Sequence, residues 1–394
     1  MSAPLASSLV NLTLVAFATL AGAHASADDL RSEPQHPGAF QPAGDAWVGP
    51  QHPGATDPAI ERAIEEAMQP YGGWTIAIDN DLFAGTQQDR DYTGGFAVGL
   101  SGPETPNHWW SLDPLLRRLD NFAPGQARAA GGGTVVQYSA QIGMLGFTPQ
   151  DINSEEVLPE DRPYASLLYM TSARQYIDAG NGRVRHTGLT VGVLGLSITS
   201  DIHDAIHDVV GSDSPRGYDN QISAGGEPTF RYVVSDSKLR AQRIAFGSGL
   251  LETKTTAEMS VGYLTEASYA VSTRFGQIDS PWWTFNPERI DYIAQPSAVA
   301  RRNGGSEFYF WAGAKLRLRA YNAFLQGQFR DSAHTFDSSE LEHVIGEAWV
   351  GVTGELGNGT TMSYSVRYQT TEISEGVGRR DPVWAGVTLT HSFM

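Results

Sequence analysis

Hydrophobic and polar residues alternate with a period of two along much of the chain after residue 73, a pattern that predicts β-strands. The segments 307–319, 360–372 and 383–393 show it most clearly. In the first of these, aromatic and leucine side chains alternate with basic ones: Phe308, Phe310, Leu316 and Leu318 against Lys315, Arg317 and Arg319. Each segment has roughly the 10 residues that a tilted strand needs to cross a bilayer.

Extended over the chain, the pattern predicts an all-β fold, a 12-stranded antiparallel transmembrane β-barrel with short helices in its loops. An even number of strands permits simple closure, although the ambiguous residues 240–252 could change the count. A soluble sandwich would place the polar faces outside, but a last strand that ends in an aromatic residue favours the membrane barrel. The predicted strands are 73–82, 91–102, 134–147, 164–178, 183–198, 227–236, 256–266, 268–276, 307–319, 343–355, 360–372 and 383–393.

Two glycine-rich turns predict tight hairpins, at Gly180-Asn-Gly182 and Gly357-Asn-Gly359. They mark one rim as the short-turn, periplasmic side. If the first strand rises from that side, five longer connections meet at the extracellular rim: 83–90, 148–163, 199–226, 320–342 and 373–382. This topology brings residues 80–93 close to Arg162 and to the histidine-bearing loop 199–226.

Residues 103–133 interrupt the strand pattern with a cluster of tryptophan and leucine residues. The cluster predicts an amphipathic helix at the membrane interface, and a helix packed under the barrel is equally consistent with it. Its apolar members are Trp109, Trp110, Leu112, Leu115, Leu116 and Leu119.

The first 27 residues resemble a secretory signal, with an apolar core followed by Ala25-Ser-Ala27 and without the usual basic start. An anchoring helix is the alternative. Residues 28–72 are rich in Pro and Gly, repeat the pentad Gln-His-Pro-Gly-Ala at positions 35 and 51, and predict an exported leader that ends in a short helix. The barrel domain is then expected to span residues 73–394.

The composition of the chain excludes some classes of protein and of binding partner. The 394 residues include no cysteine, which excludes a disulfide-stapled secreted fold. The formal net charge of −17 argues against nucleic acid as a partner. An anionic lipid then suits the chain only where cations mediate the contact.

Polar residues at the end of the first strand require an explanation. Asn80 shares the two-residue phase of Ile76 and Ile78, with carboxylates on either side. We expect it to face lipid near the outer rim. Thr93 does not fit the phase of its own strand unless a bulge or a strand end intervenes, and Tyr92 is expected in an aromatic belt.

The loop 199–226 carries the histidine candidates. His203 and His207 are four residues apart, so a helix would place them on one face, as in a zinc metalloprotease. Asp204 stands where that motif has glutamate, and no third ligand follows, which disfavours this interpretation. A serine nucleophile motif is also absent. A histidine base with carboxylates, an amide and a hydroxyl suits attack of water on an ester, assisted by a hard cation such as Ca²⁺.

Several dispersed motifs, in this order, resemble the outer-membrane lipid A 3′-O-deacylase family from about residue 73 to the C-terminus. They are Asp79-Asn-Asp-Leu-Phe83, Asp91-Tyr-Thr-Gly-Gly95, Thr148-Pro149, Asp161-Arg-Pro-Tyr-Ala165, Ile206-His-Asp-Val-Val-Gly211, Pro215-Arg-Gly-Tyr-Asp-Asn-Gln221, Leu325-Gln-Gly327, Phe329-Arg-Asp-Ser332 and Arg367-Tyr-Gln-Thr-Thr371. The resemblance implies a Ca²⁺-dependent barrel of the Gram-negative outer membrane that hydrolyses the ester-linked 3′ acyloxyacyl chain of lipid A in lipopolysaccharide.

The resemblance also assigns roles to residues. His207 matches the histidine that activates water, Asn80 and Asp81 match the pair that binds the cation and stabilises the oxyanion, and Thr93 matches a hydroxyl residue. Asp213 stands where the family has a longer carboxylate, as a third cation ligand. Substrate contacts are expected from Arg162 and from His203, which replaces a glutamine; Arg162 could instead pair with Asp161 or the barrel wall.

Two further functions remain open at this point. A barrel of this fold could have lost activity and serve a structural or binding role, or it could be a passive pore. Basic side chains that point inward argue against an open pore. The sequence gives no indication of an obligate protein partner.

Overall fold

The computed structural model describes residues 72–85, 90–122, 135–196, 216–245, 249–292, 295–296, 299 and 306–393. The predicted signal peptide and nearly all of the leader lie outside these residues. So does the segment 197–215, which contains His203, His207 and Asp213. None of the helices in the described ranges is long and apolar enough to cross a membrane.

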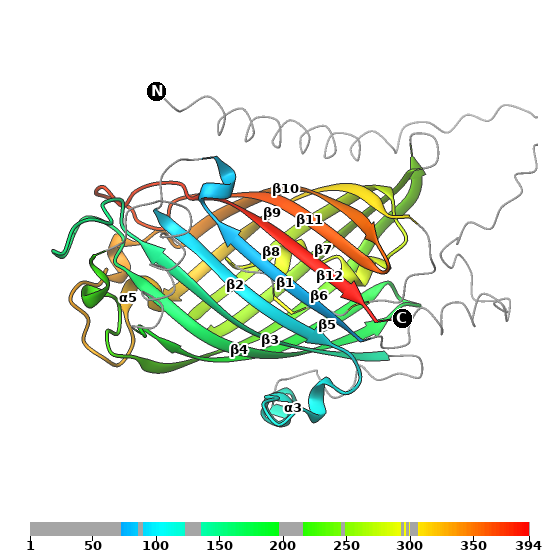
Figure 1. Cartoon of the computed structure of the whole chain (residues 1–394), viewed down its shortest axis with the longest axis horizontal. Coiled ribbons are helices and arrows are strands. Elements are labelled where there is room, and N and C mark those ends of the chain that lie inside the picture. The colour runs from blue at the N-terminus through cyan, green and yellow to red at the C-terminus, as the bar shows by residue number, and fades with distance from the viewer. Residues whose placement is uncertain are drawn as a thin grey trace, which may run out of the picture. The chain divides into compact units, whose positions relative to one another are not determined.

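Twelve strands in the described part of the chain form a closed barrel in which every neighbouring pair is antiparallel and β12 pairs with β1 (Figure 1). The strands are β1 (Gly73–Asn80), β2 (Asp91–Ser101), β3 (Val135–Thr148), β4 (Ala165–Asp178), β5 (Arg183–Leu194), β6 (Glu227–Ala245), β7 (Gly249–Gly262), β8 (Leu264–Gln277), β9 (Phe308–Asn322), β10 (Val344–Gly357), β11 (Thr360–Gln369) and β12 (Val383–Ser392). The predicted strand number is therefore confirmed. The ambiguous residues around 240–252 lengthen β6 and β7 and add no strand.

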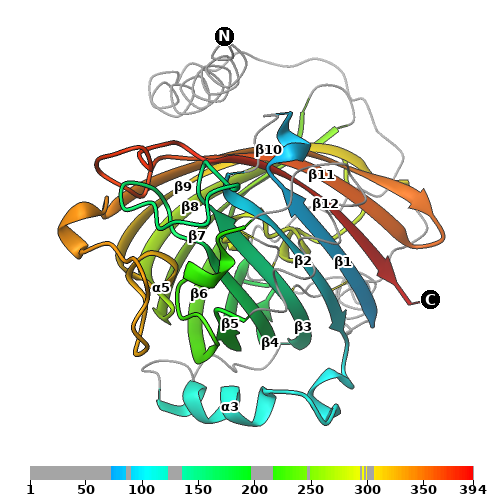
Figure 2. The same ribbon diagram turned by 60° about the vertical axis from the view of Figure 1, so that its left-hand side comes forward.

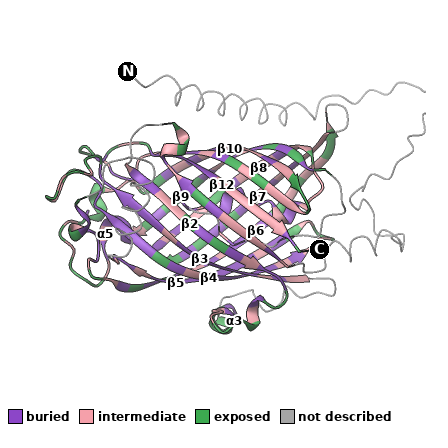
Figure 3. Ribbon diagram, viewed as in Figure 1, coloured by how far each residue is buried: buried purple, intermediate pink, exposed green. Residues whose placement is uncertain are grey.

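The faces of the strands are those of a membrane barrel. On β9, Phe308, Phe310, Leu316 and Leu318 are 51–59% exposed, whereas Lys315, Arg317 and Arg319 are at most 5% exposed. Buried and exposed residues alternate in this way along the strands of the barrel (Figure 3). The apolar side chains form an outer band, and the basic ones point into the lumen.

The predicted hairpins are present. Asn358 and Gly359 connect β10 to β11 with φ angles of 52° and 75°. A type I′ turn requires positive φ at both central residues, which asparagine and glycine tolerate best. At the other rim, the long connections contact one another: Arg380 lies 2.6 Å from Asp161, and Ser223 donates its backbone N–H to the hydroxyl of Ser332 at 2.9 Å. The predicted gathering of these connections at one rim is confirmed for their described parts.

The described part of the connection between β8 and β9 folds back into the lumen, which the sequence pattern did not indicate (Figure 2). It contains two 3₁₀ turns, η4 (Trp282–Thr284) and η5 (Pro287–Arg289). Side chains that point inward from three strands donate hydrogen bonds to its backbone carbonyls. Gln175 donates to Trp283 at 2.6 Å, Arg367 to Pro287 at 2.5 Å and Lys315 to Glu288 at 2.8 Å. We call residues 278–292 the plug segment. The plug segment therefore occupies part of the lumen.

The predicted helix in 103–133 is α3 (Asp113–Phe122), which follows the 3₁₀ turn η2 (Thr105–Asn107). It lies outside the barrel, beside β4 and β5, and not beneath the barrel opening (Figures 1 and 2). The remaining short helices in the described ranges all lie in the long connections at the rim opposite the tight hairpins. They are η1 (Leu82–Ala84), η3 (Tyr218–Asn220), α5 (Ala323–Gln326) and η6 (Ser338–Glu340).

Candidate active site

Asn80 lies on the lipid-facing side of β1, at the end of the strand that meets the long connections. Ile78, two residues earlier, is 43% exposed, whereas Ala77 and Asp79 are buried at 2% and 8%. The predicted face of Asn80 is therefore confirmed. Its Oδ1 atom accepts a hydrogen bond of 2.7 Å from the N–H of Leu82, so the side chain also caps the turn that follows the strand.

Thr93 lies in a β-bulge, which explains its anomalous phase. Tyr92 pairs with Phe147 and Gly94 with Gly146, so Thr93 has no residue opposite it on β3. Its hydroxyl is 2.7 Å from the hydroxyl of Thr148, and both side chains are buried. Because Phe147 points into the lumen, Thr148 occupies the outer face, and the bulge brings Thr93 to that face as well.

A glycine allows Asn80 to approach the bulge. Asn80 pairs with Gly94, directly after Thr93. Gly94 has a φ angle of 157°, and a Cβ atom there would lie 2.5 Å from the carbonyl oxygen of Asp79 and 3.2 Å from Nδ2 of Asn80. Only glycine lets the amide of Asn80 lie across this position. The strand ends therefore place an amide and two hydroxyls side by side at the outer rim.

Asp81 completes the strand end with a buried carboxylate. It is 3% exposed, and its Oδ2 atom accepts a hydrogen bond of 2.7 Å from the N–H of Arg90. With Asn80 it offers carboxylate and amide oxygens, the donor set that Ca²⁺ prefers. The chemistry of these donors therefore fits a hard cation. The third predicted ligand, Asp213, lies outside the described residues.

Arg162 is enclosed by acidic partners. Its side chain forms an ion pair with Glu372, and its Nε atom lies 3.7 Å from Asp91. It is 3% exposed and stacks over the ring of Phe147 with 5.0 Å between the guanidinium carbon and the ring centroid. The substrate contact predicted for Arg162 stays a prediction, and the geometry adds a structural role. Its expected partner Asp161 pairs instead with Arg380.

Sequence reasoning missed the acidic residues that organise this rim. Asp91 accepts a hydrogen bond of 2.8 Å from Arg380 and forms a longer ion pair with Arg162. Burial disfavours the charged form of Glu372, but the guanidinium groups of Arg162 and Arg319 outweigh burial and lower the pKa of Glu372 to about 2. Asp91 is the first residue of the motif that contains Thr93, and Glu372 directly follows the motif that ends at Thr371. Their partners are distant in sequence, so spacing gave no signal for either.

Tyr92 does not lie in an aromatic belt, contrary to the prediction. It is 1% exposed and packs inside the barrel against Phe147, Tyr292 and Trp384, with ring centroids 5.2–5.6 Å apart. The bulge at Thr93 reverses the phase of β2 and turns Tyr92 inward. The aromatic cluster therefore supports the bulge from the lumen side.

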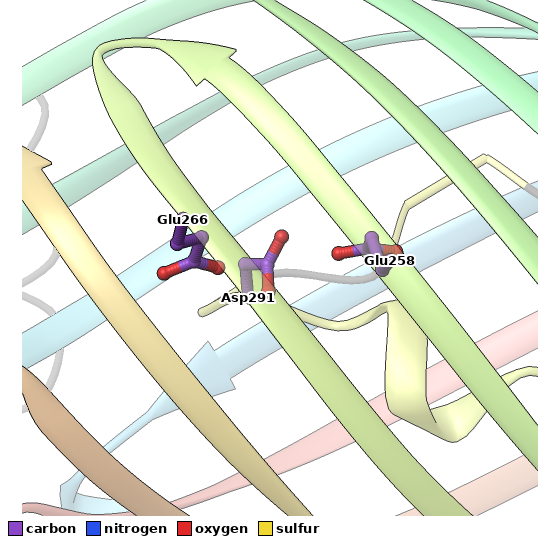
Figure 4. A group of neighbouring side chains, drawn as sticks. All are labelled: Glu258, Glu266 and Asp291. Carbon is purple, nitrogen blue, oxygen red and sulfur yellow. The ribbon is translucent and has the colours of Figure 1, made fainter.

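A second acidic group lies deeper in the lumen (Figure 4). Carboxylate oxygens of Glu258, Glu266 and Asp291 all lie within 4.8 Å of one another. Asp291, however, already accepts Lys315 at 2.9 Å and Arg317 at 3.2 Å. These cations neutralise the group and would repel a metal ion. We interpret the group as the anchor of the plug segment.

His203, His207 and Asp213 lie in the part of the 195–226 connection that the structure does not describe. Of its described residues, 216–226 cover the ends of β3 and β4. Ser166 donates to Gln221 at 2.8 Å, and the ring of Tyr218 packs on Tyr164 with centroids 4.7 Å apart. The proximity of His207 to Asn80 therefore stays a prediction.

Comparisons with known proteins identify the family. A family model described as "Outer membrane protein LpxR" matches residues 54–393. The structure is similar to LpxR from Salmonella typhimurium, with a TM-score of 0.60 and 18% identity over 82% of this chain and 100% of that one. The β domain of the Bordetella autotransporter BrkA matches at a TM-score of 0.38 with 12% identity, over 82% and 99% of the two chains. A search of curated protein sequences gives no match. The chain belongs to the LpxR family of outer-membrane proteins.

Proposed function

We propose that this protein is a lipid A deacylase of the Gram-negative outer membrane, which hydrolyses the ester-linked 3′ acyloxyacyl chain of lipid A. One observation supports this function most directly: in a chain of the LpxR family, the amide of Asn80 and the hydroxyl of Thr93 lie together on the lipid-facing side of the barrel rim. An acyl ester of lipid A lies just below the headgroup of the outer leaflet. A site that opens toward lipid at this height can reach it without removing the substrate from the membrane.

In the proposed reaction, His207 accepts a proton from water while the water oxygen attacks the carbonyl carbon of the ester. The bond from that carbon to the sugar oxygen then breaks, and His207 returns the proton to the leaving hydroxyl. The products are a free fatty acid and a deacylated lipid A. This assignment follows from family resemblance, together with the ability of neutral histidine to act as a base near pH 7.

The described residues supply hydrogen bonds for the developing oxyanion. Because Oδ1 of Asn80 accepts the Leu82 N–H, the Nδ2 group is the donor left for substrate. Asp81, Asn80 and Asp213 would hold Ca²⁺, which supplies positive charge for the oxyanion. Arg162 and His203 are proposed to contact the lipid A headgroup.

Mass spectrometry of lipid A after incubation with purified protein in detergent and Ca²⁺ tests this function. We expect loss of one acyloxyacyl chain with the wild type and at least about 100-fold slower loss with His207→Ala, because a general base contributes 10²–10⁴-fold. His108→Ala is the matched control, since His108 is exposed and follows η2, beyond the opposite end of β2 from Thr93. No acyl loss from the wild type would favour the catalytically silent barrel. Full activity of His207→Ala would refute the mechanism.

A further inference from the structure

Helix α3 is attached to the outer wall of the barrel by polar contacts. Asp113 accepts two hydrogen bonds of 2.6 Å from Arg174 on β4. Asp120 accepts hydrogen bonds from Tyr232 on β6 at 2.9 Å and from Thr187 on β5 at 3.1 Å. These partners occupy outward positions, alternate with residues that point into the lumen, and come from three adjacent strands. The position of the helix on the wall is therefore fixed at both of its ends.

These contacts bury the acidic side chains of the helix and leave its basic side chains exposed. Its only acidic residues, Asp113 and Asp120, face the wall and are 8% and 5% exposed. Its only basic residues, Arg117 and Arg118, are exposed. A protein with a formal charge of −17 thus presents a purely cationic helix surface at this place.

The same helix carries a stripe of apolar side chains that are exposed. Leu115, Leu119 and Phe122 are 49%, 38% and 85% exposed, and their spacing of four and three residues places them on one face. Trp109, just before the helix, is 96% exposed. The fully buried Leu116 faces the barrel, so the exposed stripe is an additional apolar surface.

The helix lies where the outer wall changes from apolar to polar. Toward the extracellular side, the outward residues of β4, β5 and β6 are Leu168, Val191 and Phe230, 37–52% exposed. Toward the periplasmic hairpin, they are charged: Arg183 lies 2.8 Å and Arg185 3.8 Å from Asp236. Helix α3 therefore lies against the wall at the periplasmic edge of the lipid-facing band.

We propose that α3 is a membrane-surface anchor that binds anionic phospholipid of the periplasmic leaflet. The apolar stripe, with Trp109, inserts among the upper acyl carbons, and Arg117 and Arg118 bind the phosphate groups. The position of the helix at the edge of the lipid-facing band and the positive charge of its exposed surface both favour this partner over a second protein. The proposal concerns the opposite end of the barrel from the candidate active site and does not depend on the proposed function.

The absence of cysteine from the chain permits a direct test with single nitroxide labels. In reconstituted protein, labels at Leu119→Cys and Phe122→Cys should be more accessible to oxygen than to a nickel chelate, like a label at the lipid-facing Phe230→Cys. A label at the exposed Lys238→Cys on β6, below the band, should show the reverse. Labels on α3 that behave like Lys238→Cys would overturn the proposal. Labels shielded from both reagents would do so too, because they would indicate a protein partner.

Phospholipid bound to the purified protein tests the headgroup contact. After reconstitution in equal amounts of phosphatidylglycerol and phosphatidylcholine, mass spectrometry of retained lipid should show a preference for phosphatidylglycerol. The double variant Arg117→Gln/Arg118→Gln should reduce that preference by at least about threefold. Arg240→Gln/Arg243→Gln removes the same charge from the exposed end of β6 and should leave it unchanged. An equal loss in both double variants, or none in either, would contradict phosphate binding by α3.

Discussion

The hydroxyl of Tyr292 donates a hydrogen bond of 2.9 Å to Glu372 and thereby joins the plug segment to the rim that carries the candidate active site. Glu372 also pairs with Arg162, which approaches Asp91 at the start of β2. The ring of Tyr292 packs on Tyr92, 5.2 Å between centroids, directly below the bulge that holds Thr93. The candidate active site is therefore supported from within the barrel.

Removing the charge of Glu372 should destabilise this support. Glu372→Gln leaves Arg162 and Arg319 buried without their shared carboxylate, and breaking a buried ion pair costs about 3–5 kcal/mol. We expect a loss of this size in the free energy of unfolding, measured by urea titration in lipid vesicles. The exposed Glu375→Gln should change it by less than about 0.5 kcal/mol. Equal stability of the two variants would show that the buried pairs contribute little.

The same carboxylate should make stability depend on acid pH. The pKa of Glu372 falls from an unfolded value of 4.5 to about 2 in the folded protein. A depressed pKa stabilises the folded state above the unfolded pKa, and this contribution is lost as the pH falls from about 4.5 to about 2. Unfolding midpoints measured across this range should fall more steeply for the wild type than for Glu372→Gln. Parallel curves would exclude Glu372 as the source.

The close approach of Asn80 to the bulge predicts that Gly94→Ala reduces activity. The new Cβ atom would lie 2.5 Å from the backbone of Asp79, so the strand ends must separate. A displacement of about 1 Å can cost about 100-fold in rate, and we expect a loss of that order in acyl release. Gly99→Ala on the same strand is the control, because its Cβ atom would meet nothing nearer than 3.5 Å. It should retain activity within about twofold.

Strand number and face could be predicted from the sequence because a period of two is a local property. Lys315 alternates with Leu316 whatever the rest of the chain does. In the sequence, the bulge at Thr93 shows only because Thr93 does not fit the two-residue alternation of its strand. The shift in pairing between Tyr92 and Gly94 explains that mismatch. The direction of Tyr92 depends on that bulge, so its predicted place in the belt was wrong.

Contacts inside the lumen could not be predicted, because they join residues far apart in the chain. The plug segment has no hydrophobic period, and ion pairs connect its Asp291 to two different strands, β6 and β9. The acidic residues of the rim have the same character: Asp91 and Arg380 are 289 residues apart. Such pairs follow from barrel closure and register, which the sequence pattern does not specify.

Replacing Asp81 should weaken the proposed dependence on Ca²⁺. Asp81→Asn keeps the shape of the side chain and removes its charge, so the cation would bind less tightly. We expect the Ca²⁺ concentration for half-maximal acyl release to rise by at least about tenfold, with activity recovered at high Ca²⁺. Asp331→Asn, at an exposed position of an extracellular connection, should leave that concentration unchanged. Activity of the wild type in excess chelator would exclude a role for the cation.

The plug segment predicts that the barrel does not conduct ions. Asp291 fixes the segment by pairing with Arg231, Lys315 and Arg317, three cations on β6 and β9. In planar bilayers the wild type should therefore show no stable conductance. Asp291→Asn leaves these buried cations without their common carboxylate, and their mutual repulsion should loosen the segment.

We expect transient conductance in Asp291→Asn and none in the control Asp331→Asn, whose side chain is exposed outside the lumen. Steady conductance by the wild type would support the pore function instead. Because the plug segment also carries Tyr292, the Asp291 variant should lose acyl-release activity in parallel with the gain in conductance. Conductance gained at full activity would show that the rim does not depend on the segment below it.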